Sequence, residues 1–203
     1  GLGDVYKRQV FMSLGGPLIP GGMRNIVSQM IREGHVDLIV SSGANLTHDL
    51  LEAFGGAHYR DEGKDDEELN AEGIGRIADI NVGSNDFEVF EKEINRLFEI
   101  ISAKKPVISI QELIYEIGML IDDENSFIAT AARNNVPIFA PGIIDCMIGL
   151  QLWIFSQDHD FTISAVEDMA YLSDFVYNSK NVTACMLGGG LPKHYTLASN
   201  ILT

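Results

Sequence analysis

The chain has 203 residues, 46% of them hydrophobic, which suits one globular α/β domain with a substantial core. Its formal net charge of −15 excludes the basic face that nucleic-acid binding needs. An acidic surface suits solubility in the first place, and it can also attract cationic substrates or a basic protein partner. No run approaches the roughly 20 apolar residues of a membrane span. The two cysteines, Cys146 and Cys185, form no CxxC pair, which favours a reducing, cytoplasmic compartment over a disulfide framework or a zinc site.

Both ends of the chain look unnatural. Residues 1–9 resemble the translation of a sequencing-library adapter, so we leave them out of the fold prediction. The other end stops at Thr203, inside what still has the pattern of a helix, without a cap or a polar tail. We therefore expect residues 10–203 to form a single domain that is truncated at both ends.

The hydrophobic pattern alternates short apolar runs with amphipathic helices. In chain order it predicts a strand at 10–14, a helix at 23–32, a strand at 36–42, helices at 46–54, 86–102, 110–121 and 125–134, a strand at 137–140, helices at 147–156 and 165–179, a strand at 182–187, and a last helix after 188–190. The polar, acidic stretch 55–75 is expected to be a solvated excursion. Apolar strands alternating with helices predict a three-layer α/β/α, Rossmann-like fold with a parallel sheet.

The predicted strands end in four conspicuous sequences, at residues 15–22, 41–49, 140–145 and 188–194. Ligands of open parallel sheets bind beyond the carboxyl ends of the strands. Glycine at such a turn lets the backbone approach a ligand, and the following helix N-terminus can bind an anion such as a pyrophosphate. Any one of these turns can be simply a tight turn, and no GxGxxG fingerprint is present. Glycine-bearing turns at all four ends nevertheless indicate a nucleotide site.

Three polar residues at these ends have alternative explanations. Asp145 follows an apolar strand, and a buried carboxylate must be paired. It can cap the next helix or bind a cofactor hydroxyl. Helix capping explains Asp49 adequately. His194 stands in the first turn of the last helix, where it can pack, cap, or move a proton near neutral pH.

The strand-end sequences also carry a family resemblance. The matching segments are Gly22-Met23-Arg24, Ser42-Gly43-Ala44-Asn45-Leu46-Thr47-His48-Asp49, Gly73-Ile74-Gly75-Arg76-Ile77, Pro137-Ile138-Phe139-Ala140-Pro141 with Asp145, and Leu187-Gly188-Gly189-Gly190 with Lys193-His194. This ordered set resembles the deoxyhypusine synthase family over nearly the whole chain after Gln9. The resemblance implies a homotetramer with NAD as cofactor, in which the aminobutyl part of spermidine passes through an enzyme lysine to a lysine of a translation initiation factor.

The resemblance also implies site residues. The residues that would line NAD are Gly16, Pro17, Leu18, Ile19, Pro20, Ser42, Gly43, Ala44, Asp145 and Gly189. His194 would be the catalytic residue facing the polyamine, and Thr47 and His48 take the substrate-binding positions of paired glutamates in eukaryotic members. Leu150 replaces a second aspartate of those members. These variants resemble a prokaryotic branch.

Two other functions stay open at this point. Homospermidine synthases use the same scaffold with putrescine as the acceptor. A non-catalytic nucleotide-binding domain is the alternative from another class, because the carboxylates at Thr47, His48 and Leu150 are missing. The family's lysine is expected beyond Thr203, and Lys193 is not that residue. We therefore expect this fragment to be inactive by itself.

Overall fold

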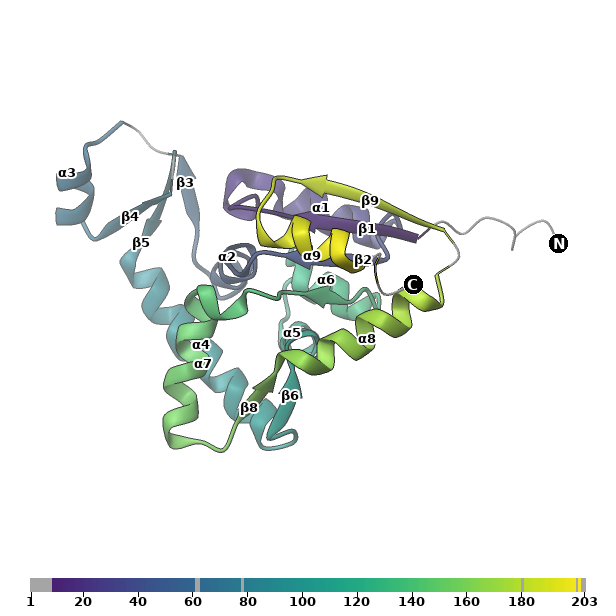
Figure 1. Ribbon diagram of the computed structural model, residues 1–203. Helices are drawn as coiled ribbons and strands as arrows, with labels where there is room; N and C mark the ends of the chain where they lie inside the picture. The colour runs from purple at the N-terminus through teal and green to yellow at the C-terminus, as the bar shows by residue number, and fades with distance from the viewer. Residues whose placement is uncertain (1–8, 61–62, 78, 180, 200, 202–203) are drawn as a thin grey trace.

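A four-stranded parallel sheet forms the centre of the computed structural model, which describes residues 9–60, 63–77, 79–179, 181–199 and 201. Its strands lie in the order β7 (Ile138–Phe139), β2 (Leu38–Ser41), β1 (Gln9–Leu14) and β9 (Val182–Leu187) (Figure 1). The four predicted strands and their parallel arrangement are confirmed, with β1 beginning one residue earlier than expected, at Gln9. All four carboxyl ends therefore lie at one edge.

Helices connect and cover these strands. Their bounds are α1 (Arg24–Arg32), α2 (Gly43–Ala53), α4 (Ser84–Ser102), α5 (Ile110–Leu120), α6 (Phe127–Arg133), α7 (Met147–Asp158), α8 (Ala165–Tyr177) and α9 (Leu191–Ser199). Each predicted helix is present within a few residues. A π-helical turn, η1 (Ile19–Met23), precedes α1. Within the described residues, no helix has the length and apolar character needed to cross a membrane.

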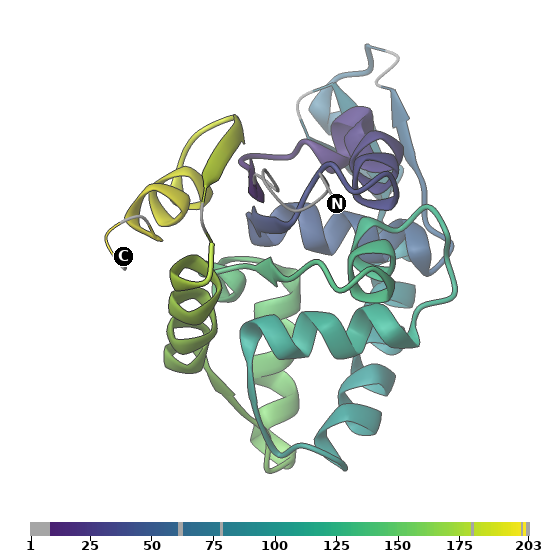
Figure 2. The ribbon, with the colours of Figure 1, turned by 90° about the vertical axis from the view of Figure 1, so that its right-hand side faces the viewer.

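Each face of the sheet packs against its own set of helices, which makes the three layers. Met12 and Leu14 join the large cluster that α1, α2, α4, α5, α6 and α7 build, whereas Phe11 joins a smaller cluster with Leu172 and Val176 of α8. Figure 2 shows α8 and α9 on one side of the strands and α1 on the other. The predicted α/β/α fold is thus confirmed, because alternate residues of one strand point into opposite clusters.

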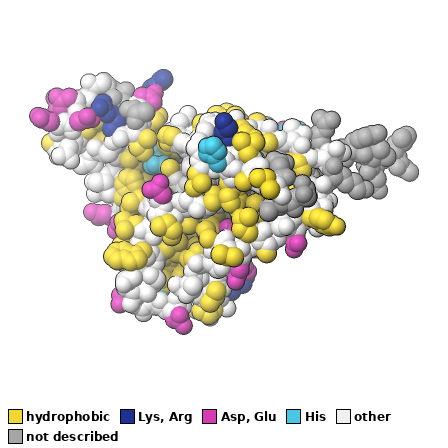
Figure 3. Space-filling model, in the orientation of Figure 1, with side chains coloured by type: hydrophobic (Ala, Val, Ile, Leu, Met, Phe, Trp, Pro, Cys, Tyr) yellow, Lys and Arg dark blue, Asp and Glu magenta, His cyan; other side chains and the backbone are white. Residues whose placement is uncertain are grey.

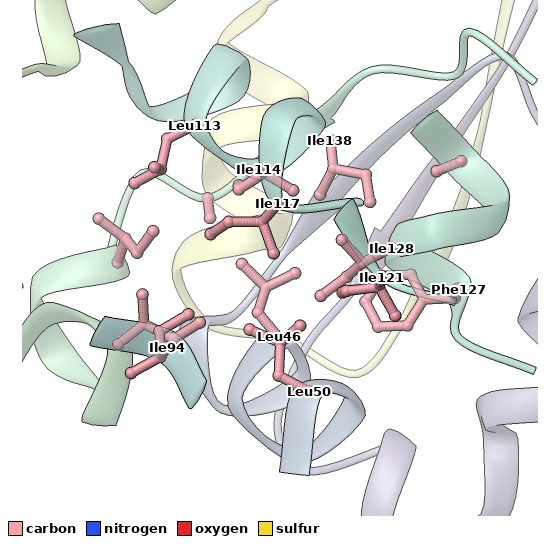
Figure 4. Close-up of a cluster of buried hydrophobic side chains, with 14 of the residues drawn as sticks. Leu46, Leu50, Ile94, Leu113, Ile114, Ile117, Ile121, Phe127, Ile128 and Ile138 are labelled. Carbon is pink, nitrogen blue, oxygen red and sulfur yellow. The ribbon is translucent and has the colours of Figure 1, made fainter. Parts of the chain in front are cut away.

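The large cluster contains the side chains that hold the helices in place next to the carboxyl ends of the strands. Figure 4 shows Leu46 and Leu50 of α2 pointing toward Ile117 of α5 and toward Phe127 and Ile128 of α6. Burying one such side chain stabilises a fold by roughly 1.5–3 kcal/mol. These contacts hold α2 against its neighbours.

The stretch predicted as a solvated excursion forms most of an arm that projects from the body of the molecule, and among its described residues only Leu69 is buried. The arm contains β3 (His58–Arg60), α3 (Asp66–Ala71), β4 (Ile74–Ile77) and β5 (Ile80–Gly83), with the strands paired antiparallel in the order β3-β5-β4 (Figure 1). Part of the acidic run forms α3, because Asp65 caps it by accepting a hydrogen bond from Glu68 N at 2.8 Å. The solvated excursion is therefore confirmed, whereas its short strands and α3 were not predicted, because short strands with exposed polar residues resemble loops.

A second small sheet also escaped prediction. β6 (Val107–Ser109) and β8 (Thr162–Ser164) pair in parallel at the end of the molecule opposite the arm. Ser109 caps α5, and Asp168 of α8 accepts a hydrogen bond from Gln111 N at 2.9 Å. This pair joins α5 to α8.

Candidate functional site

The loops after β1 and β9 touch at the carboxyl edge of the sheet. A Cβ on Gly15 would lie 2.8 Å from Gly189 N, and one on Gly188 would lie 3.2 Å from Gly15 O. Side chains at these positions would push the two loops apart. The packing of the two loops therefore requires a glycine at position 15, which agrees with the explanation that this segment is simply a tight turn.

The start of α2 orders the loop after β1. Ser42 Oγ donates a hydrogen bond to Gly16 O at 3.0 Å. Asn45, which is fully buried, accepts one from Ile19 N at 3.0 Å and donates one to Leu14 O at 3.2 Å. Because both donor and acceptor groups of the amide are used, this loop is fixed relative to α2. Sequence reasoning missed Asn45 as an organising residue, although its place after the second strand was a usable signal.

The loop after β7 completes a ring with the other three loops. A Cβ on Gly43 would lie 2.8 Å from Cys146 Cβ, and one on Gly142 would lie 2.7 Å from Leu191 Cδ2 of α9. The loop after β7 thus contacts both the start of α2 and the start of α9. The structure brings all four predicted strand-end segments together around one edge.

The residues predicted to line NAD differ in accessibility. Gly16, Pro17, Asp145 and Gly189 are exposed, Leu18, Ser42 and Ala44 are half-buried, and Ile19, Pro20 and Gly43 are buried. The exposed and half-buried members can reach a ligand. The buried members shape the loops beneath them.

Gly189 has no packing partner that explains its small size. Its φ lies outside the left-handed region, and no heavy atom comes within 4 Å of the position of an added Cβ. Neither backbone strain nor loop packing therefore requires glycine here, in contrast to Gly15. An exposed glycine of this kind leaves room for a ligand to lie against the backbone.

Asp145 is exposed, which corrects the expectation of a buried carboxylate. It ends the short 3-10 helix η2 (Ile143–Asp145), and the N-cap position of α7 is taken by Cys146. Asp145 therefore does not cap α7, so that explanation is wrong. Its carboxylate is open to solvent beside the contact between Cys146 and Gly43.

The two predicted substrate-binding residues of α2 face inward. Thr47 is 3% exposed, and its Oγ1 is buried without a hydrogen-bond partner among the described residues. His48 is 7% exposed, and its Nδ1 lies 2.8 Å from Nε2 of His58 on β3. Burial, reinforced by neighbouring His58, lowers the pKa of His48 to about 4, so its imidazole is neutral near pH 7.

Asp49 caps a helix, but not the one that contains it. Its carboxylate accepts hydrogen bonds from Ser126 Oγ at 2.6 Å and from the backbone N–H groups of Phe127 and Ile128 at 3.2 Å each, at the start of α6. It also pairs with Arg24 of α1 at 2.7 Å. Burial raises the pKa of the Asp49 carboxyl, while Arg24 and the surrounding donors act in the opposite direction. The capping prediction had the wrong helix, and the residue is structural.

His194 is exposed on the first turn of α9. Its backbone N–H donates to Gly190 O at 3.2 Å, and its side chain forms no hydrogen bond with the described residues. Its position follows directly from the loop that contains Gly189. Two hollows lie elsewhere, one of about 300 Å³ in the arm beside Leu69 and Val82 and one of about 510 Å³ between α4 and the end of α2.

Known proteins match this chain over nearly its whole length. The family model for deoxyhypusine synthase matches residues 4–203. A "probable deoxyhypusine synthase" of Methanothermobacter thermautotrophicus is 57% identical over 202 residues, and another from Methanopyrus kandleri is 38% identical over 193 residues. A crystal structure of a candidate deoxyhypusine synthase from Entamoeba histolytica superposes with a TM-score of 0.73 at 18% identity, over 94% of this chain and 61% of that one.

The chain spans 66% and 62% of the lengths of the two archaeal relatives. The family match includes residues 4–9, part of the segment interpreted as an adapter. Residues 1–8 lie outside the described structure, so the boundary at residue 9 stays a prediction.

Proposed function

This chain belongs to the deoxyhypusine synthase family, and we propose that the full-length protein is an NAD-dependent transferase that moves the aminobutyl group of spermidine to a lysine of a translation initiation factor. The observation that supports this proposal is the ring of four strand-end loops. Gly15 packs on Gly189, Ser42 bonds to Gly16, Gly43 packs on Cys146, and Gly142 packs on Leu191. Dinucleotides bind at such an edge in doubly wound sheets.

The residues at this edge fit NAD. The first backbone N–H groups of α2 have no partner within the helix, and that of half-buried Ala44 suits a phosphate. The exposed face of Gly189 leaves space for the ligand, and the open Asp145 carboxylate can accept a hydrogen bond from a ribose hydroxyl. When bound, NAD accepts a hydride from the carbon beside an amine, and the chain's own residues bind and orient the reactants.

The polyamine would lie beside the NAD site. His194 is exposed at the same edge, where its imidazole can take up or release a proton of the amine being oxidised. A net charge of −15 attracts a polycation. Thr47 and His48 are both nearly buried, so neither binds the polyamine as a freely exposed group. In this proposal the small accessible part of His48 makes the contact with the polyamine.

We propose a homotetramer in the cytoplasm for the full-length protein. Large apolar side chains of α7 are exposed, with Trp153 62% and Leu150 44% accessible, and hydrophobic side chains gather on this face in Figure 3. Exposed apolar patches of this kind mark protein interfaces. Cys146 and Cys185 are free thiols, as a reducing compartment allows.

The proposal is tested with the full-length protein, NAD and spermidine. We expect spermidine-dependent formation of NADH, and transfer of label from radioactive spermidine to the purified initiation factor. Label that moves to putrescine instead would identify a homospermidine synthase. NAD binding without transfer to either acceptor would contradict both activities and favour a non-catalytic nucleotide-binding domain.

A further inference from the structure

Three side chains form a continuous hydrogen-bonded chain between α2 and the arm. His48 Nδ1 lies 2.8 Å from His58 Nε2, and His58 Nδ1 lies 2.7 Å from Glu52 Oε1. The other carboxylate oxygen of Glu52 lies 3.4 Å from Arg24. His48 and Glu52 are one turn apart on α2, whereas His58 comes from β3. The arm thus supplies the middle member of the chain.

The chemistry of the three groups sets the direction of their hydrogen bonds. An ionised carboxylate only accepts, so His58 donates from Nδ1 to Glu52. The Nε2 of a neutral His58 is then an acceptor, and His48 must donate to it from Nδ1. The Nε2 of neutral His48 keeps its lone pair, and no described residue bonds to it. With His58 neutral, the outer end of the chain is therefore a proton acceptor.

A metal site does not explain this arrangement. A bound cation needs lone pairs that converge on one point, whereas the two ring nitrogens of His58 are used by His48 and Glu52. No group of three or more potential ligands that could hold a metal ion occurs in the part of the chain that the structure describes. The geometry is that of a hydrogen-bonded relay.

We propose that His48, His58 and Glu52 form a proton relay that accepts one proton from an ammonium group of the substrate, a role that rests on the proposed polyamine chemistry. The ammonium N–H proton moves to His48 Nε2, and the Nδ1 proton of His48 moves to His58 Nε2. The amine becomes neutral, and the positive charge ends on His58 beside Glu52. His48 would touch the substrate, while His58 and Glu52 act through it.

The surroundings favour a positive charge at the inner end of the relay. Arg24 of α1 is shared among Asp49, Glu52 and Asp123, so carboxylates outnumber the cation there. Asp86 of α4 adds another carboxylate close by, since it accepts a hydrogen bond from Ala57 N at 3.4 Å. His48 lies five residues after Gly43, which is about 7.5 Å along the helix axis from the ligand edge.

Two isosteric variants separate a relay from a positioning role. His58→Gln keeps a donor for Glu52 and an acceptor for His48, but an amide cannot pass a proton on. Glu52→Gln should reverse the chain, because its remaining oxygen stays with Arg24 and its NH₂ group turns to His58 Nδ1. Glu72→Gln, which alters an exposed ion pair with Lys64, is the matched control.

The experiment combines nitrogen NMR of ¹⁵N-histidine-labelled chain with kinetics of the full-length protein, after thermal melting has shown that each variant folds. We expect a bare Nε2 on His48 in the parental chain and in His58→Gln, and a protonated Nε2 in Glu52→Gln. With spermidine and NAD, both variants should lower kcat by roughly 10²-fold with KM nearly unchanged, and Glu72→Gln should match the parental protein. A protonated Nε2 in the parental chain, or full activity of His58→Gln, would overturn the relay. A parental protein without spermidine-dependent NADH formation would refute the proposed function instead, and the spectra alone would then decide the arrangement of the relay.

Discussion

The single residues at the carboxyl edge of the sheet are of two kinds: some hold the loops in place, and others are exposed, where a ligand could reach them. Asn45 and Asp49 are fully buried and their polar atoms have hydrogen-bond partners, whereas Asp145 and His194 are exposed and make no side-chain bonds with the described residues. Substituting an exposed residue leaves the fold intact. Asp145 and His194 are therefore the positions where an effect on binding or catalysis can be separated from an effect on stability.

Asp145→Ala should weaken NAD binding without unfolding the protein. Losing a hydrogen bond to a charged group costs roughly 1.5–3 kcal/mol, which corresponds to about tenfold or more in Kd. Calorimetric titration of the full-length protein with NAD measures this directly. Asp160→Ala, another exposed carboxylate, is the control and should bind NAD as the parental protein does. Equal affinity in all three proteins would remove Asp145 from the site.

His194→Ala should slow spermidine-dependent NADH formation by roughly 10²-fold or more, because a positioned acid–base group is lost. NAD affinity should hardly change, since the imidazole is expected to face the polyamine. Stopped-flow absorbance of NADH gives the rate, and calorimetry gives the affinity. A parental rate in the variant would show that His194 is not the catalytic acid–base residue.

His48 should make stability depend on pH. Its pKa is about 4 in the folded chain and 6.5 in the unfolded one, so the unfolded state binds more protons between these values. Stability is complete above about pH 6.5 and falls as the pH drops, by about 2 kcal/mol near pH 5 and about 3 kcal/mol near pH 4. Urea unfolding near pH 7 and pH 5 measures the difference. His48→Gln should abolish this part of the slope, whereas replacement of exposed His35 by Gln should keep it.

At the scale of elements, Asp49 joins α1, α2 and the start of α6. Asp49→Ala leaves buried Arg24 with a weaker set of partners and uncaps α6, so we expect a loss of roughly 3–5 kcal/mol. Urea unfolding reports the free energy. Glu93→Ala removes only the surface pair with Arg96 and should cost less than about 1 kcal/mol. Similar losses in both variants would mean that the buried pair adds nothing beyond a surface pair.

The elements that the sequence predicts are those with a strong local pattern. The strands β1, β2 and β9 are short runs made mostly of apolar residues, and α4 has a stripe of apolar residues at helical spacing, so each carries a local signal. The arm has no such pattern, because β3 is His58-Tyr59-Arg60 and its pairing with β5 depends on residues 20 to 24 positions away. Long-range pairing cannot be deduced from a local period.

For the site as well, only the features that follow from the order of strands and loops in the sequence were predictable. Parallel strands imply that four loops meet at one edge, and the structure confirms that meeting. The contact of His48 with His58 and the capping of α6 by Asp49 were not predictable, since each joins residues from elements whose packing the sequence does not reveal. The exposure of Asp145 depends on the turn of η2, which also has no sequence signal.

The whole chain of 203 residues spans only about two thirds of the lengths of its two archaeal relatives, so its activity by itself can be tested separately from that of a longer protein. In the proposed mechanism, a lysine expected beyond Thr203 would be the covalent acceptor of the aminobutyl group, since such transfer needs an activated amine. The 203-residue chain should therefore retain no label when it is incubated with NAD and radioactive spermidine and then treated with borohydride. NAD binding by the same preparation, measured by calorimetry, is the control for an intact edge of the sheet. The full-length protein in a parallel reaction should trap label, and a lysine-to-alanine variant of its downstream segment should not. Label that stays on the 203-residue chain would place an acceptor lysine within it, and peptide mapping would then identify which one.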